Sequence, residues 1–199
     1  MRYIFVLIMA ASAVMAICAG QVSAAERFGA FAVFDSLKDA ILLDGEITSK
    51  TPGDLKRALA ARPEASIVVL GSSGGLVPAA LKLASEVRRL GLSTAIPSGF
   101  GCYSACAYVY FAGVEHVVKG ELGVHRLSTG TTADGASTLA YFDDVRRDLA
   151  RYNIPEPVLQ RMVTTPPTGI YVFSSREISQ YALNRTKGAG SLTAQIAAR

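Results

Sequence analysis

Short apolar runs alternate with amphipathic stretches along this chain, and this pattern constrains its fold most strongly. The run Ser66–Leu70 (SIVVL) is mostly apolar, as a strand buried on both faces of a parallel sheet should be. A glycine-rich turn, Gly71–Gly75, follows it, and Leu76–Leu90 then has helical periodicity and stops at Gly91. This order of strand, tight turn and helix predicts an α/β fold with a largely parallel sheet.

The same alternation continues over most of the sequence. Further strands are expected at Ala40–Leu43, Leu92–Ile96, Glu115–Val118, Leu122–His125 and Ile170–Phe173. Helices are expected at Thr51–Ala61, Ser104–Phe111, Ser137–Tyr152 and Pro155–Val163, and a last one runs from Ser174 or Ser175 to Leu183. These elements predict one domain over residues 25–185, and the Gly- and Ala-rich residues 186–199 are expected to be a flexible C-terminal tail.

The N-terminus has the pattern of a secretory signal peptide. Arg2 precedes an apolar run, Tyr3–Ala19, and the small residues Ser23 and Ala24 complete a cleavage-like site. Residues 1–24 therefore predict export to the periplasm or the medium, with membrane contact only through this segment. An uncleaved membrane anchor is the alternative, since the run is only slightly short of the roughly 20 residues that span a bilayer.

The charge pattern indicates no nucleic-acid partner. The net charge is only +4, and the Lys and Arg residues are scattered without a basic block or interleaved aromatic residues.

Two cysteines, Cys102 and Cys106, flank Ser104. An oxidising compartment would permit a disulfide between them, but two cysteines four apart on one helix point their Cβ atoms poorly for a bridge. We therefore favour two buried thiols over a disulfide. No metal site and no cofactor are expected, because no third ligand lies nearby at a suitable spacing.

Ser104 is the candidate nucleophile, because it lies where a glycine-containing turn enters a helix and where free N–H groups gather. It could instead be a simple helix cap. The turn Gly71–Gly75 can bring N–H donors close to a ligand oxygen, as an oxyanion hole requires. His125, at a strand end before a loop, is the candidate base, whereas His116 lies inside an apolar strand and is interpreted as structural.

These segments together resemble the Clp protease proteolytic subunit (ClpP) and its relatives in the crotonase-like superfamily, over about residues 41–183. Ser72–Gly75 is similar to the family's Ser-Pro-Gly-Gly oxyanion turn, with Ser73 in place of the proline. Ser104–Gly113 is similar to its nucleophile helix, and Gly123–Arg126 to the strand that bears its catalytic histidine.

The resemblance implies a ClpP/crotonase-like spiral of ββα units with a mostly parallel sheet, and a homo-oligomer. It also implies a serine peptidase for short or unfolded peptides, with Ser104 as nucleophile and His125 as base. The oxyanion hole would use Gly74, Gly75 and Ala105.

The sequence departs from the family at the third member of the triad. The resemblance places the acid just before Phe173, where Ile170 stands, and Asp143, Asp144 and Asp148 on the long helix are uncertain substitutes. Loss of the orienting carboxylate costs on the order of 10⁴-fold in serine proteases. A catalytically silent domain that binds peptides or protein partners is therefore the main alternative.

Two enzymatic alternatives are disfavoured. A Ser-Lys peptidase of the signal-peptide-peptidase type needs a downstream lysine, and none lies between Glu121 and Thr186. A coenzyme A enzyme of the crotonase type would lack its cofactor outside the cytoplasm.

Overall fold

The computed structural model describes residues 25–127, 145–188 and 191–197. In chain order the elements are β1 (Glu26–Phe28), β2 (Phe31–Val33), β3 (Ala40–Leu43), α1 (Thr51–Ala61), β4 (Ile67–Leu70), α2 (Val77–Arg89), β5 (Ser93–Ile96), β6 (Gly101–Tyr103), α3 (Cys106–Ala112), β7 (His116–Val118), β8 (Glu121–Val124), α5 (Glu156–Thr164), β9 (Tyr171–Val172), α6 (Ser175–Gln180) and α7 (Leu192–Ala197). Residues 145–150 are also helical. The expected signal peptide, residues 1–24, and residues 137–144 of the predicted long helix lie outside the described residues.

The main sheet has six strands in the order β1-β2-β3-β4-β5-β7. The pairs β3/β4, β4/β5 and β5/β7 are parallel, whereas β1 and β2 form an antiparallel hairpin that continues antiparallel to β3. This arrangement confirms the predicted α/β class with a mostly parallel sheet. The spiral of ββα units stays a prediction.

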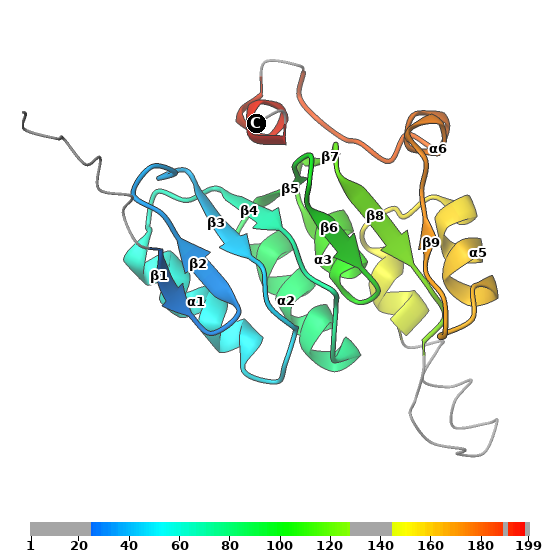
Figure 1. Cartoon of the computed structure of the whole chain (residues 1–199), viewed down its shortest axis with the longest axis horizontal. Coiled ribbons are helices and arrows are strands. Elements are labelled where there is room, and N and C mark those ends of the chain that lie inside the picture. Colours follow the sequence, from blue (N-terminus) through cyan, green and yellow to red (C-terminus); the bar gives the residue numbers. More distant parts are fainter. Residues whose placement is uncertain (1–24, 128–144, 189–190, 198–199) are drawn as a thin grey trace, which may run out of the picture.

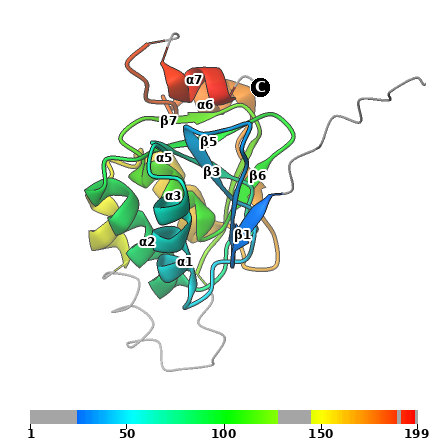
Figure 2. The ribbon, with the colours of Figure 1, turned by 90° about the vertical axis from the view of Figure 1, so that its left-hand side faces the viewer.

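Helices α1, α2 and α3 cover one face of this sheet, which Figure 1 shows from the strand side and Figure 2 from the edge. Side chains alternate along each strand, so in β3 Ile41 and Leu43 pack toward the helices in the larger core, while Ala40 and Leu42 belong to a second cluster. The helix α2 begins with Pro78 in its first turn and ends before Gly91, whose φ is +67°. Its predicted boundaries were therefore correct to within a residue.

The short helix α7 packs against β5 and β7, and its Ile196 belongs to the second apolar cluster, on the face opposite the larger core. Figure 1 shows it at the top of the sheet. Ile196 is only 3% exposed, and Thr193 is also buried. Leu192–Ala197, inside the tail expected over residues 186–199, is therefore helical and packed on the sheet. The Gly- and Ala-rich composition of the segment does not indicate this, because a single buried side chain, Ile196, anchors it.

A second sheet, in the order β6-β8-β9, positions the candidate site. β6 pairs parallel to β8, with Tyr103 beside Gly123, and β8 pairs antiparallel to β9, with Gly123 beside Val172. Because side chains alternate, Leu122 and Val124 point into the core, whereas Gly123 and the residues paired with it share the outer face. The strand β6 is not among the expected strands, because the sequence indicates only a glycine-containing turn before Ser104 and a helix from Ser104 onward.

In the described part of the chain, no helix combines the length and the hydropathy that crossing a membrane would require.

Candidate active site

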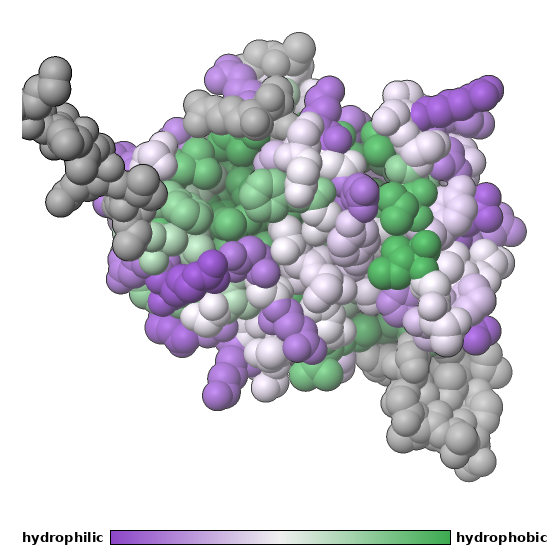
Figure 3. All heavy atoms as spheres, in the orientation of Figure 1, coloured by the Kyte–Doolittle hydropathy of each residue, from purple (hydrophilic) through white to green (hydrophobic). Residues whose placement is uncertain are grey.

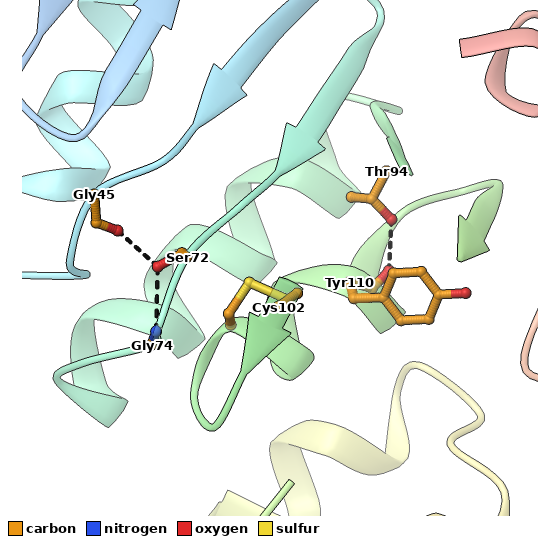
Figure 4. The surroundings of a disulfide bond; sticks show 7 residues. Gly45, Ser72, Gly74, Thr94, Cys102 and Tyr110 are labelled. Carbon is orange, nitrogen blue, oxygen red and sulfur yellow. Dashed lines mark hydrogen bonds between the residues drawn. A yellow bond between two sulfur atoms is a disulfide. The ribbon is translucent and has the colours of Figure 1, made fainter. Parts of the chain in front are cut away.

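The glycine-rich turn after β4 is held at defined points (Figure 4). Ser72 is buried, its hydroxyl donates to the carbonyl oxygen of Gly45 at 2.6 Å, and it accepts from the N–H of Gly74 at 3.2 Å. Gly74 and Gly75 have φ values of +98° and +144°, which L-residues rarely adopt. The residue types of the turn are therefore dictated by its backbone.

The bonds that hold this turn leave one of its N–H groups unused. The carbonyl of Gly74 accepts from the N–H of Ile47 at 2.7 Å, and the N–H of Leu76 donates to the carbonyl of Ile47 at 2.8 Å. The N–H of Gly75, between them, has no hydrogen-bond partner among the described residues.

Ser104 lies at a sharp bend between β6 and α3. Its φ is +55°, in the left-handed region, which costs an L-residue roughly 1–2 kcal/mol. Its N–H donates to the carbonyl of Gly123 at 2.9 Å, and its carbonyl accepts from the N–H of Ala107 at 3.0 Å. Ser104 is partly exposed. Helix α3 begins two residues later, at Cys106, so the predicted start of the helix at Ser104 is too early.

The glycine turn and the Ser104 bend touch. A Cβ atom added at Gly74 would lie 2.9 Å from Ser104 Cβ and 3.0 Å from the amide nitrogen of Ala105. The N–H of Ala105 has no hydrogen-bond partner among the described residues. Gly74 therefore packs directly against Ser104 and Ala105, which are far from it in sequence, as an oxyanion turn beside a nucleophile would require.

His125 follows the last residue of β8. The register places Tyr103 beside Gly123, so the chain leaving β6 at Ser104 runs beside the end of β8, about 5 Å from it, the ordinary distance between strands. His125 Nδ1 lies 2.8 Å from the carbonyl oxygen of Arg126, and the ring is partly exposed. Among the hydrogen bonds of the described residues, none joins Ser104 to His125.

No carboxylate orients His125 within the described residues. The ladder of β8 and β9 pairs Val124 with Tyr171, so the next pair along would be His125 with Ile170. The ladder itself ends at Val124 and Tyr171, and Ile170 leans over Gly123, two residues before His125. Asp148 contacts Arg151 at 3.5 Å instead, and Asp143 and Asp144 lie outside the described residues.

Cys102 and Cys106 form a disulfide, so the expectation of two free thiols is wrong. That expectation placed both residues on one helix, but Cys102 is the middle residue of β6 and Cys106 the first residue of α3. The bend at Ser104 brings their Cα atoms to 5.3 Å. Figure 4 shows the bridge beside the Ser72 turn.

His116 is buried among aromatic side chains, and its Nδ1 lies 3.2 Å from the carbonyl oxygen of Gly113. Burial lowers its pKa to about 4, although the hydrogen bond to Gly113 opposes this change. A ring held neutral in the core agrees with its structural interpretation.

Tyr103, which the sequence did not single out, covers the outer face of the second sheet. Its ring lies where a Cβ atom at Gly101 or Gly123 would stand, and its hydroxyl bonds Glu121, which raises the pKa of the tyrosine. Ile170 also leans over Gly123. The sequence feature that could have indicated this packing is a glycine two residues from a large side chain in each strand, in Gly101-Cys-Tyr103 and in Glu121-Leu-Gly123.

This face carries exposed apolar side chains. Ile170 and Val172 are 47% and 41% exposed. Figure 3 shows hydrophobic surface in this region, over β8 and β9.

A mostly apolar cavity of about 270 Å³ has in its wall Tyr108, of α3, and Leu127, two residues after His125. The remainder is formed by residues of the 145–150 helix and α5, including Leu149, Leu159 and Met162.

Among the described residues, no group of three or more His, Cys, Asp or Glu side chains is arranged to hold a metal ion.

No family model matches the sequence, and no curated protein matches it. Solved structures do match the fold. A mutant of the 1510-N membrane-bound stomatin-specific protease is similar, with a TM-score of 0.54 and 18% identity, over 73% of this chain and 75% of that one. A mutant of ClpP1 from Listeria monocytogenes is similar with a TM-score of 0.56 and 14% identity, over 74% of this chain and 89% of that one. The chain therefore has a ClpP-like fold.

Proposed function

We propose that this protein is an exported serine hydrolase, a peptidase for short or unfolded peptides, with Ser104 as nucleophile and His125 as base. The observation that carries the proposal is the left-handed Ser104, at φ +55°, packed against Gly74. A serine that only capped α3 would need neither feature, because a cap residue usually has extended backbone.

The proposed reaction passes through an acyl-enzyme. His125 Nε2 takes the proton of the Ser104 hydroxyl, and Oγ attacks the carbonyl carbon of the scissile bond. The N–H groups of Gly75 and Ala105 stabilise the oxyanion, and Gly74 provides the close approach. His125 then protonates the leaving amine, and water, deprotonated by His125, hydrolyses the ester and restores Ser104.

The contact between His125 and Arg126 supports this role for the histidine. A carbonyl oxygen can only accept, so the neutral ring holds its proton on Nδ1 and leaves Nε2 free to act as a base. The backbone beside this carbonyl is held, because the N–H of Arg126, in the preceding peptide unit, donates to the carbonyl of Thr165 at 2.8 Å. The carbonyl thus supplies the orienting contact, although it lacks the negative charge of a carboxylate.

A fluorophosphonate probe tests the proposal. The purified protein should become labelled, with the adduct mapped to Ser104 by mass spectrometry, and Ser104→Ala should remove the label. His125→Ala should slow labelling on the order of 10²- to 10⁴-fold. Ser179→Ala, which changes an exposed serine of α6 away from the site, is the matched control and should label normally.

An absence of labelling between mildly acidic and alkaline pH would contradict the proposal. It would favour a silent domain that binds peptide or protein partners, an alternative that the exposed apolar side chain of Ile170 supports.

Export is supported by the buried Cys102–Cys106 disulfide, since such bonds persist in oxidising compartments. Fractionation of cells followed by mass determination should find the protein outside the cytoplasm, lacking residues 1–24. An intact chain in the cytoplasm would contradict this part of the proposal. The homo-oligomer stays a prediction, which sedimentation of the purified protein would measure.

A further inference from the structure

We propose that the Cys102–Cys106 disulfide is a positioning clamp that keeps Ser104 in its left-handed, reactive conformation. This inference rests on the proposed hydrolase function, and it adds a role for two residues that take no part in the chemistry. The clamp acts through Ser104 and does not contact the substrate.

The position of the bridge carries the inference. Ser104 lies midway between the two cysteines, and the bond joins the strand before the bend to the first residue of the helix after it. Both cysteines are fully buried, whereas Ser104 is partly exposed. The disulfide therefore lies beneath the bend and leaves the outer side of Ser104 open to a substrate.

The bridge excludes the competing backbone conformation. If β6 continued through Ser104 as extended chain, the Cα atoms of Cys102 and Cys106 would be separated by about 13 Å, at roughly 3.3 Å a residue. The bond holds them at 5.3 Å. A change of Ser104 from left-handed to extended backbone would relieve its strain. The short loop closed by the disulfide opposes this change, because it keeps the two ends of the bend close together.

Hydrogen bonds hold the bend only in part. The N–H of Tyr103 donates to the carbonyl of Ser72 at 3.0 Å, and the N–H of Ser104 donates to the carbonyl of Gly123 at 2.9 Å. Both bonds fasten the strand side to its neighbours, whereas the carbonyls of Ser104 and Ala105 bond within the start of the helix, to the N–H groups of Ala107 and Tyr108 at 3.0 and 3.2 Å. The disulfide adds a covalent restraint between this helix start, where the N–H of Ala105 lies next to Cys106, and β6.

A double variant, Cys102→Ala with Cys106→Ala, tests the clamp. The rate of fluorophosphonate labelling is measured on folded protein, well below the melting temperature, together with the melting temperature itself. We expect labelling to slow by about tenfold in addition to the loss of thermal stability.

A matched control separates positioning from general destabilisation. Ile196→Ala truncates a buried side chain of α7, which packs on β5 and β7 away from Ser104, and should lower the melting temperature without slowing the labelling of folded protein. If the double variant labels at the wild-type rate, the disulfide only stabilises the fold and the clamp is overturned.

Two further measurements cover the remaining outcomes. If the double variant does not fold, the same rates are measured on folded wild-type protein reduced by a water-soluble phosphine. The phosphine becomes its oxide, taking oxygen from water, as the disulfide becomes two thiols.

If the wild-type protein does not label at all, the proposed hydrolase fails, and the backbone chemical shifts of Ser104 are compared with and without the bridge. Left-handed shifts that persist without it would overturn the clamp, and shifts that move toward extended values would support it.

Discussion

His125 Nδ1 lies 2.8 Å from the carbonyl oxygen of Arg126, the residue that follows it in the chain. The contact requires the proton of the neutral ring to sit on Nδ1. We therefore predict the Nδ1–H tautomer for His125, measured by nitrogen-15 NMR of the neutral ring and assigned by loss of the signal in His125→Gln. A predominant Nε2–H tautomer would remove the free base from the proposed site.

Replacement of Ser104 should show an unusual order of stabilities. Ala keeps the cost of the left-handed backbone at φ +55°, whereas Gly relieves it, so Ser104→Gly should be more stable than Ser104→Ala by about 1 kcal/mol. Chemical denaturation of both variants measures the difference, and neither should label. A more stable Ala variant would show that the bend is not left-handed in solution.

Gly74→Ala should both destabilise the protein and remove labelling. Its new Cβ atom would stand 2.6 Å from the carbonyl oxygen of Tyr103 and 2.9 Å from Ser104 Cβ. Gly99→Ala is the matched control, because Gly99 also has a positive φ but has nothing within 4 Å of its Cβ position. We expect Gly74→Ala to cost about 2 kcal/mol more than the control in free energy of unfolding. Equal costs would contradict the close approach.

His116 should make the protein less stable in acid. Its pKa is about 4 in the folded protein, below the ordinary value of about 6.5 in the unfolded chain. Between these two pH values the unfolded chain therefore binds more protons than the folded protein. The contribution of His116 to the free energy of unfolding is fully present above pH 6.5 and is lost as the pH falls toward 4, by about 3 kcal/mol in all. Urea unfolding across this range measures the slope.

The control for this prediction is His116→Asn, which cannot titrate and should flatten the pH dependence. If the variant and the wild-type protein lose stability in parallel, another group is responsible.

Ile170→Asp should increase the reactivity of Ser104. Ile170 and His125 each come one residue beyond the last pair of the ladder, Tyr171 with Val124, so we expect a carboxylate at position 170 to stabilise the protonated ring that forms when Ser104 loses its proton. We expect fluorophosphonate labelling to become faster by about tenfold or more. Ile170→Asn, of similar shape but uncharged, is the control. An Asp variant no faster than the Asn variant would show that position 170 does not communicate with His125.

The local pattern of the sequence determined much of the fold. The continuous apolar run in β4, the proline at the start of α2 and Gly91 at its end each act on neighbouring residues, so they could be recognised without the rest of the chain. Ser104, His125 and the glycines of the turn were recognised for the same reason. Each stands at the junction of a strand with a turn or a helix.

The tertiary structure alone decided how these residues meet. The φ of Ser104, the packing of Gly74 against it and the disulfide all depend on two strands and a helix arriving at one place, which no local spacing reveals. The same holds for α7, whose buried Ile196 is placed by an apolar sheet face formed from residues much earlier in the chain. The sequence thus singled out the candidate residues, and only the packing of distant segments decided their conformation.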